Sequence, residues 1–515
     1  MTTLQSGLHD LSPVLRGLQR GIEKESLRVT LDGRLAMTPH PPALGSALTH
    51  PHVTTDFSEA QLELITGVHR DVDACIDELG QLHQFVHRQL RDEMMWCASM
   101  PCLLPAEASI PIARYGDSNV GRAKAVYRTG LSHRYGRRMQ MISGVHYNFS
   151  IPPDSWPVGA LGNANQGYLA LIRNFRRHGW LLLLLFGASP AVCASFVEGR
   201  THALQELGPG TLHLPFATSL RMGRLGYLSE AQDALSVSYN DLESYAASLS
   251  DALNQPYPAY EAIGIRDGDD YRQLATSLLQ IENEFYSTIR PKRVTRPGER
   301  PLHALRERGI EYVEIRSMDL DPFAAAGITR EAVHFLDVFL IHCLVSESPP
   351  DTPAERFELA RNNQRVAAGG REPGLELERG GRPVSLREWA MEVLGACVPI
   401  ATALDAACGG SGHRDALVNS RRALDDMALL PSARVLREMK QQHGGSYAPF
   451  VLAYSLAHRK AMLATRLDPE LEAGYMRMAQ ASRDEQRAIE AADSMPFETY
   501  RQQYLAPASL LADPR

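Results

Sequence analysis

The stretch GIEKESLR, residues 21–28, alternates in the manner of a β-strand and places Glu23 and Glu25 on the same face of it. Two carboxylates that share a face repel each other unless water or a cation lies between them. A chain that contains such a strand must therefore leave this face open to solvent or build a cation site over it.

Three later stretches repeat this arrangement. Glu63 lies in QLELIT, soon after Asp56 in VTTDF, His146 lies in GVHYNFS, and YVEIRS carries Glu314 and Arg316 on one side. The alternate residues of these stretches are mostly apolar. The pattern predicts short antiparallel strands that each have one apolar face and one ionisable face.

For any one of these strands, a solvated sheet face is the simpler explanation. Five acids and an imidazole on separate strands together favour a site for a hard cation, because carboxylate oxygens are ligands that Mg²⁺ and Mn²⁺ prefer. A dication would also offset the repulsion between neighbouring carboxylates. The predicted metal ligands are Glu23, Glu25, Asp56, Glu63, His146 and Glu314.

Magnesium in enzymes commonly accompanies phosphate, so cationic side chains should lie nearby. The segment IRPKRVTRPGER supplies Arg290, Lys292, Arg293 and Arg296, although the same residues would also suit a solvated loop. The chain has neither the G-x-x-x-x-G-K-[ST] motif of a P-loop nor the G-x-G-x-x-G motif of a Rossmann site. A nucleotide site in this chain would belong to another architecture.

The composition of the chain limits the classes of protein to which it can belong. A chain of 515 residues with 44% hydrophobic residues can bury a large core, and its net charge of −7 argues against broad binding to nucleic acid or an anionic membrane. The seven cysteines are scattered without C-x-x-C spacing, and the N-terminus lacks the pattern of a signal peptide, so we expect reduced thiols in a cytoplasmic protein. The apolar run WLLLLLF, residues 180–186, predicts a buried core segment.

The periodicity indicates an α+β fold. LRVTLDGRLAMT, residues 27–38, predicts a β-hairpin that turns at Asp32 and Gly33, and residues 75–94 predict an amphipathic helix. REPGLELERGGRPVS, residues 371–385, is the best candidate for a boundary, because the periodicity beyond it is helical. We expect a catalytic region over residues 1–373 and a helical C-terminal portion, residues 374–515, packed on it.

Nine longer stretches occur in one order along residues 17–323: GLQRGIEKESLRV, LGSALTHPHVTTDFSEAQLELIT, SMPCLLPAE, YRTGLSHRYG, MQMISGVHYNFSIP, LFGASPAVCASF, LPFATSLRMGRLGY, LQIENEFYSTIRPKR and GIEYVEIRSMDLDPF. Together they resemble the proteobacterial type of the glutamate–cysteine ligase (γ-glutamylcysteine synthetase) family. Long motifs in the family's order are more specific than any single acid.

The resemblance implies a glutamine-synthetase-like fold, in which a curved antiparallel sheet forms a funnel for metals, ATP and glutamate. It implies that ATP converts the γ-carboxylate of L-glutamate into a γ-glutamyl phosphate. The amine of L-cysteine then attacks to give γ-glutamylcysteine, ADP and phosphate, the first step of glutathione biosynthesis. The implied cofactor is Mg²⁺ or Mn²⁺, with ATP as co-substrate.

Position by position, the resemblance implies that the six predicted ligands hold metal. It places Arg316 beside the transferred phosphate and makes Arg221 a second cationic contact with substrate. No side-chain nucleophile is needed, so Cys102 and Cys193 are expected to pack or to line the pocket. The residues implied to surround the amino acids or ATP are Tyr127, Arg128, Gln140, Tyr227, Tyr286 and Lys292.

Three alternatives are set against this interpretation. A related carboxylate–amine ligase that joins glutamate to another amine would keep the metal residues and differ around Tyr127, Tyr227 and Tyr286. A regulatory nucleotide-binding module is disfavoured because the acid set is intact, and a bifunctional glutathione-making enzyme because about 140 residues after Arg371 leave too little chain for a second ATP-using domain. We further expect a monomer that binds no nucleic acid or membrane and is open to feedback inhibition by glutathione.

Overall fold

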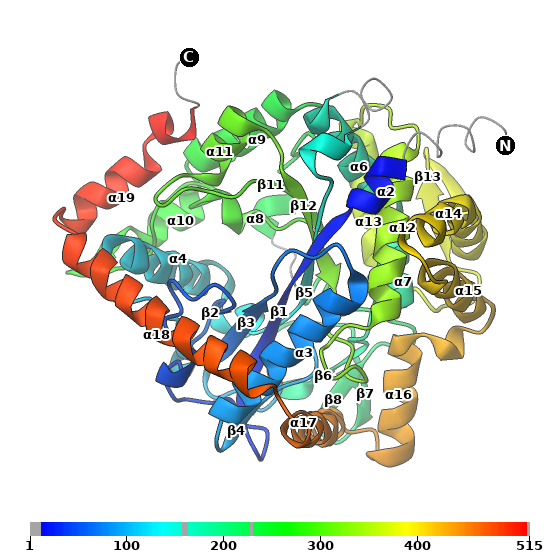
Figure 1. Cartoon of the computed structure of the whole chain (residues 1–515), viewed down its shortest axis with the longest axis horizontal. Helices are drawn as coiled ribbons and strands as arrows, with labels where there is room; N and C mark the ends of the chain where they lie inside the picture. The colour runs from blue at the N-terminus through cyan, green and yellow to red at the C-terminus, as the bar shows by residue number, and fades with distance from the viewer. Residues whose placement is uncertain (1–11, 157–162, 227–229, 234, 512–515) are drawn as a thin grey trace.

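The computed structural model describes residues 12–156, 163–226, 230–233 and 235–511. A seven-stranded antiparallel sheet lies at its centre, and its long strand β1 runs through the middle of the molecule (Figure 1). The strand order is β11-β12-β5-β1-β3-β2, with β4 paired to the far end of β1. The strands are β1 (Gln19–Thr30), β2 (Val53–Thr55), β3 (Gln61–Ile65), β4 (Glu93–Met95), β5 (Val145–Ser150), β11 (Ile289–Lys292) and β12 (Tyr312–Met318).

One face of this sheet is apolar and covered by helices. Ile22 of β1, Tyr147 and Phe149 of β5, and Val313 and Ile315 of β12 are completely buried. Burying a side chain of this size contributes about 1.5–3 kcal/mol, so this face fixes the register of the strands. The helices that pack here are α3 (Val72–Gln89), α6 (Ala164–His178) and α7 (Trp180–Phe186), with α12 (Arg330–Val345) behind them.

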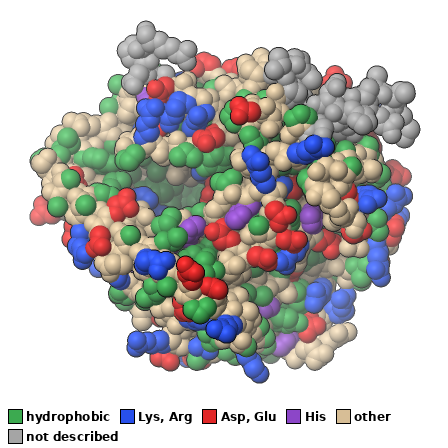
Figure 2. Space-filling view, viewed as in Figure 1, with side chains coloured by type: hydrophobic (Ala, Val, Ile, Leu, Met, Phe, Trp, Pro, Cys, Tyr) green, Lys and Arg blue, Asp and Glu red, His purple; other side chains and the backbone are tan. Residues whose placement is uncertain are grey.

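Other helices surround the opposite, ionisable face. In Figure 1, α4 and α18 lie on one side of the sheet, and α9 and α11 lie near its β11 edge. These helices are α4 (Asn119–Tyr135), α9 (Leu242–Asn254), α11 (Pro301–Arg308), α18 (Pro469–Ala492) and α19 (Phe497–Leu505). They leave a hollow on the face of the molecule seen in Figure 2.

The C-terminal portion is mainly helical, as its periodicity predicts. Its helices are α14 (Leu386–Cys408), α15 (Gly412–Asp425), α16 (Pro431–Gln442), α17 (Tyr447–Ala464), α18 and α19. Leu394 of α14 and Leu417 of α15 belong to the same hydrophobic core as Phe335 of α12. A division at residue 373 stays a prediction.

The remaining elements are short or peripheral. Helix α13 (Pro353–Gly369) precedes the ribbon of β13 (Glu376–Arg379) and β14 (Arg382–Ser385), and β6 (Ala191–Cys193), β8 (Thr211–His213) and β7 (Gln205–Gly208) form a small sheet. The rest are α2 (Ser12–Gly17), α5 (Arg137–Gln140), α8 (Glu230–Asp233), α10 (Pro258–Ile263), β9 (Arg266–Asp267) and β10 (Asp270–Tyr271).

Within the described chain, α14 is the helix whose length and composition would suit a membrane span, and 39% of its apolar window is buried in the protein. One such helix is weak evidence for a membrane protein, because core helices of globular proteins meet the same criteria.

Two local predictions are confirmed and one is only partly right. The amphipathic helix is α3, whose N-cap Asp71 accepts a hydrogen bond from Ala74, although it ends at Gln89 and the last predicted residues belong to β4. The apolar run is the buried helix α7. The chain does turn at Gly33, with a φ of 86°. The second arm of the expected hairpin, however, is reduced to a single bridge between Leu35 and Val29, and β4 pairs with the other edge of this end of β1.

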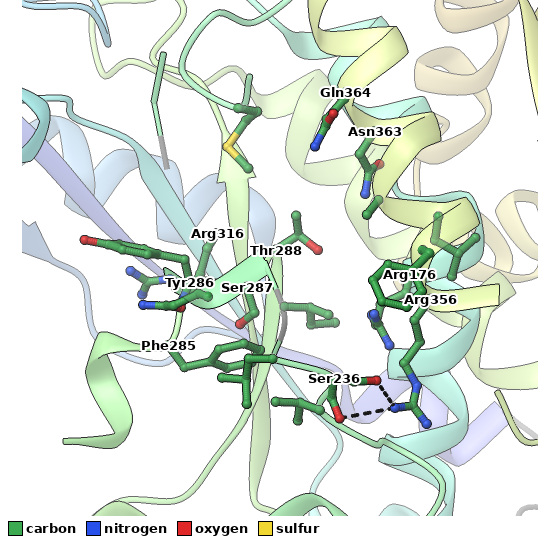
Figure 3. A pocket seen from close by; sticks show the side chains of 18 of the residues that line it. Arg176, Ser236, Phe285, Tyr286, Ser287, Thr288, Arg316, Arg356, Asn363 and Gln364 are labelled. Carbon is green, nitrogen blue, oxygen red and sulfur yellow. Dashed lines mark hydrogen bonds between the residues drawn. The ribbon is translucent and has the colours of Figure 1, made fainter. Parts of the chain in front are cut away.

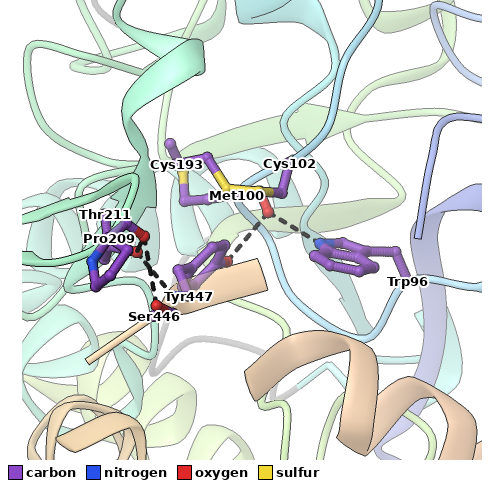
Figure 4. The surroundings of a disulfide bond; sticks show 8 residues. All are labelled: Trp96, Met100, Cys102, Cys193, Pro209, Thr211, Ser446 and Tyr447. Carbon is purple, nitrogen blue, oxygen red and sulfur yellow. Dashed lines mark hydrogen bonds between the residues drawn. A yellow bond between two sulfur atoms is a disulfide. The ribbon is translucent and has the colours of Figure 1, made fainter. Parts of the chain in front are cut away.

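The expectation that all cysteines are reduced is wrong for Cys102 and Cys193, which form a disulfide (Figure 4). The bond joins the loop after β4 to the end of β6, across a sequence separation of 91 residues. Beside it, the carbonyl of Met100 accepts hydrogen bonds from Trp96 Nε1 (3.0 Å) and Tyr447 OH (3.1 Å). Only the fold brings the two cysteines together, so their spacing in the sequence gives no sign of the bond.

Candidate active site

The register of the central sheet gathers the predicted ligands on its ionisable face. Glu23 of β1 lies opposite His146 of β5, and Glu25 lies opposite Glu63 of β3. Glu314 of β12 lies opposite Asn148, two residues beyond His146. Paired residues of antiparallel strands share a face, so the predicted one-sided arrangement of these strands is confirmed.

Two groups of three potential metal ligands result. Glu23, His146 and Glu314 form one group, and Glu25, Glu63 and His146 form the other; within each, the donor atoms lie within 4.8 Å of one another. His146 belongs to both groups, and its two ring nitrogens lie 3.4 Å from Glu23 and 3.5 Å from Glu25. All six predicted ligands, Asp56 included, line one cavity of about 830 Å³.

Hydrogen bonds from neighbouring groups orient the carboxylates. The backbone N–H of Gly144 donates to Glu25 Oε2 (2.7 Å), and Asn148 Nδ2 donates to Glu23 Oε1 (2.8 Å). The second oxygen of each carboxylate lies next to a ring nitrogen of His146. A Cβ at position 144 would overlap the guanidinium of Arg221, which explains why glycine stands there.

The acids divide into two electrostatic classes. Burial would raise the pKa of Glu314, but Lys292 (3.2 Å) and Arg316 (2.9 Å) hold it well below its usual range. Burial, followed by repulsion from Glu23, Asp56 and Glu25, raises the pKa of Glu63 well above its usual range. Burial and Asp56 also raise the pKa of Glu25. The group around Glu63 therefore has more negative charge than the protein itself neutralises.

This imbalance is the observation that tests the donor set for a metal. Carboxylates whose pKa is raised by one another are the groups that a dication would stabilise, and oxygen donors with one imidazole suit Mg²⁺ or Mn²⁺. The residues present therefore fit a divalent cation. A third group, Glu299, His303 and Glu307, differs because Arg308 pairs with both of its carboxylates.

The structure brings most of the predicted substrate residues to the same cavity. Gln140 Nε2 donates to Tyr286 OH (2.9 Å), and Arg128 donates to the carbonyl of Asp56. Burial raises the pKa of the Tyr286 phenol, so it stays protonated and able to donate. Those that line the cavity are Tyr127, Arg128, Gln140, Tyr286, Lys292 and Arg316. Tyr227 lies outside the described residues.

Arg221 lies behind this cavity. It is 1% exposed, and its Nη2 donates to the carbonyl of Arg316 (2.8 Å). Asp319, which the sequence reading missed, lies 3.6 Å from Arg221 and accepts hydrogen bonds from Ser189 and Ser219. The only signal for Asp319 was an acid just beyond the strand that carries Arg316, too weak a pattern to single it out.

A comparison of sequences decides the family. The family model for glutamate–cysteine ligase matches residues 5–366. The chain belongs to the glutamate–cysteine ligase family. A glutamate–cysteine ligase of Alcanivorax borkumensis is 46% identical over 509 residues, covering 96% of this chain and 97% of that protein. One of Azotobacter vinelandii is 48% identical over 505 residues, covering 96% and 95%.

Solved structures agree with this family. The crystal structure of a glutamate–cysteine ligase from Francisella tularensis in complex with AMP has a TM-score of 0.91 and 34% identity, and covers 96% of this chain and 98% of that one. A bifunctional glutathione synthetase from Pasteurella multocida has a TM-score of 0.69 and 26% identity, and covers 88% of this chain but 54% of that one. The ligase is thus an ATP-dependent enzyme that joins glutamate to cysteine, with an α+β fold.

Proposed function

We propose that this ligase activates the γ-carboxylate of glutamate as an acyl phosphate in the 830 Å³ cavity, and that cysteine then displaces the phosphate. One observation carries the proposal: six metal-ligand candidates, Arg316 and Lys292 line one cavity over the ionisable face of the sheet. We also propose that this cavity is the funnel of a glutamine-synthetase-like fold. A bare carboxylate is a poor electrophile, whereas an acyl phosphate has a good leaving group.

Mg²⁺, or Mn²⁺, would be held by Glu23, Glu25, Asp56, Glu63, His146 and Glu314. When bound, it would neutralise negative charge on the polyphosphate and on the γ-phosphoryl group in transfer. Gly144 and Asn148 fix the orientation of two ligands through their hydrogen bonds, so little reorganisation is needed on binding.

The cationic side chains act on the transferred phosphoryl group. Arg316 and Lys292 both contact Glu314, which holds their cationic groups at the cavity wall, where they would attract phosphate oxygens. Arg221 supports the backbone of Arg316 from behind. The phenols of Tyr127 and Tyr286, with Gln140, would orient the amino acids and exclude water from the acyl phosphate.

Oxygen transfer tests the chemical route. If the γ-carboxylate attacks the γ-phosphorus of ATP, one carboxylate oxygen leaves with phosphate when the amine of cysteine attacks. Glutamate labelled with ¹⁸O in that carboxylate should deliver one labelled oxygen to inorganic phosphate for each dipeptide formed. Unlabelled phosphate, or release of AMP and pyrophosphate, would exclude the acyl phosphate.

The identity of the amine needs its own assay, because a related ligase could use another amine in the same site. Phosphate release with glutamate, ATP and a panel of amines should be fastest with L-cysteine. The informative controls are serine and 2-aminobutyrate, which keep the shape of cysteine but lack its thiol. A higher kcat/KM with an amine unrelated to cysteine would favour the alternative ligase.

Three properties of the molecule in solution complete the proposal. We propose a cytoplasmic monomer whose activity is open to feedback by glutathione, with residues 1–373 as the catalytic region and residues 374–515 packed on it. Sedimentation at several protein concentrations tests the monomer. The Cys102–Cys193 disulfide bears on the compartment, since a reducing cytoplasm disfavours such bonds.

A further inference from the structure

A second cavity, of about 240 Å³, lies between the start of β11 and helix α13 (Figure 3). Arg316 and Tyr286 line both this cavity and the candidate active site. These two side chains therefore form part of the wall between them. No role in the proposed reaction is assigned to the α13 side of this cavity.

The charge of its wall favours an anion. Four arginines line the cavity, and none of the described lining residues is acidic. At the α13 end, Arg176 and Arg356 share the single carboxylate of Asp351, at 3.0 and 3.1 Å. Two guanidinium groups with one carboxylate leave a net positive charge at this end. A buried anion next to such a pair would gain charge-assisted hydrogen bonds.

Donors at this end remain available to a ligand. Within the described chain, Arg176 donates from Nη1 alone, and Arg356 donates from Nε and Nη1, to Asp351 and Ser236. Among the described residues, no protein atom accepts a hydrogen bond from the Nη2 group of Arg176 or of Arg356. A second binding element is polar and neutral: the amides of Asn363 and Gln364 face the cavity in Figure 3, and Ser287 lines it as well.

Apolar side chains make up much of the remaining lining, beside the polar Gln232, Ser236 and Thr288. Phe285 and Phe357, with Met222 and Leu183, cover the space between the arginines and the sheet. Phe357 lies on α13 and is 51% exposed, so part of its ring is open to a ligand. An inorganic anion would leave this apolar surface without a partner, whereas an organic anion would cover it.

We propose that this cavity is a second ligand site of the enzyme, which binds a small organic carboxylate. The carboxylate accepts hydrogen bonds from Arg176 and Arg356, the apolar body packs on Phe285 and Phe357, and the amides of Asn363 and Gln364 bind a second polar group. The site is distinct from the metal-lined cavity, since none of the six predicted metal ligands lines it.

Calorimetric titration with 3-phenylpropionate tests the site, and the uncharged 3-phenylpropionamide is the matched probe. The full chain is titrated with Mg²⁺ and saturating glutamate present, so that carboxylate sites in the active cavity are filled. The carboxylate should bind and the amide should not. Arg356→Gln should weaken binding about tenfold or more, the scale of a lost hydrogen bond to a charged group.

Two further variants separate the site from general effects. Asn363→Leu removes an amide that faces the cavity, and should weaken a probe with a para-hydroxyl group more than the parent probe. Arg365→Gln, on the exposed side of α13 where Arg365 pairs with Glu378, should leave binding unchanged. Thermal unfolding of each variant shows whether it is folded.

Four results would overturn the proposal: no binding of the carboxylate probe with or without glutamate, equal binding by folded Arg356→Gln, equal binding of the uncharged amide, or binding of the probe that is seen without glutamate and lost when glutamate is saturating. The last would place the probe in the active cavity and leave the proposed function standing. The Glu63→Gln variant separates the two proposals in the other direction. It should lose turnover if the proposed function is correct, and it should still bind the probe at the second site.

Discussion

At the residue scale, neighbours in β1 face opposite environments. Glu23 and Glu25 line the cavity, whereas Lys24 between them lies on the helix-covered face, 2% exposed, and donates to Ser26. Burial lowers the pKa of Lys24 to about 7. The strand therefore places two carboxylates on one face and a buried lysine on the other within three residues.

Lys24→Met should change how stability depends on pH. The folded pKa of about 7 lies below the ordinary value of 10.5, so between these pH values the unfolded chain binds more protons and the free energy of unfolding rises with pH. Each unit of difference is worth about 1.4 kcal/mol. Urea unfolding across this range should show the rise in the parent and a smaller one in Lys24→Met. The exposed Lys460 gives the control Lys460→Met, and equal slopes in both variants would refute the assignment.

Arg316→Lys tests the role of the guanidinium in phosphoryl transfer. Lysine keeps the charge but loses the planar fork that contacts Glu314 and, in the proposed role, would contact the phosphoryl oxygens at the same time. We expect kcat to fall about 100-fold, as for loss of one donor to a transition state, with a smaller change in the KM for ATP. Arg361→Lys on the exposed face of α13 is the control. A large rise in KM at unchanged kcat would assign Arg316 to ground-state binding instead.

At the element scale, the disulfide fastens two segments that support the active site. The loop that carries Cys102 also carries Ser99, whose carbonyl accepts from Ser143 beside Gly144 and whose hydroxyl accepts from the backbone of Leu320. Cys193 ends β6, in the small sheet. The bond therefore links that sheet to the backbone that orients Glu25.

Cys102→Ser should destabilise the fold without removing a catalytic group. A cross-link that closes a loop of this length contributes about 2–4 kcal/mol. Denaturant unfolding under oxidising conditions should show this loss, and added reductant should lower the stability of the parent but not of the variant. Cys408→Ser, at an exposed free cysteine, is the control. Equal stability of Cys102→Ser and the parent would indicate that the bond does not form in solution.

The elements themselves were largely predictable from local pattern. β5 and β12 alternate because one face packs on helices, and α3 has its apolar residues at helical spacing, so each could be recognised from its own residues. Strand pairing depends on distant parts of the chain, so it could not be predicted from local pattern. β4 pairs with the end of β1, and Cys102 bonds to Cys193, through contacts that no short stretch encodes.

At the scale of the whole molecule, the candidate site is built from both ends of the chain. Tyr500 and Tyr504 of α19, and Asp493 after α18, line the same cavity as Glu23. Arg300 fixes α19 there, since it donates to the carbonyl of Tyr504 (2.8 Å) and pairs with Glu282 (2.6 Å). The helical pattern of α18 and α19 predicts a buried face but not what it covers, so their part in the site was invisible in the sequence.

The stability of the whole chain should respond to Mg²⁺, and more strongly as pH rises. In the metal-free protein the raised pKa of Glu63 and Glu25 means that the folded chain keeps protons which the unfolded chain releases near pH 4.5, so stability falls as pH rises above that value. A cation that binds the ionised carboxylates reverses this loss. The increase in Tm on adding Mg²⁺ should therefore be larger at about pH 8 than at about pH 6.

Matched variants assign this effect to the proposed site. Glu63→Gln removes one unneutralised carboxylate and should abolish most of the Mg²⁺-dependent increase in Tm, because it lowers both the charge and the number of oxygen donors in its group. Glu307→Gln removes an acid from the third group, whose carboxylates are already paired with Arg308, and should keep the increase. An increase that is equal at both pH values, or that survives in Glu63→Gln and disappears in Glu307→Gln, would move the metal away from the central sheet.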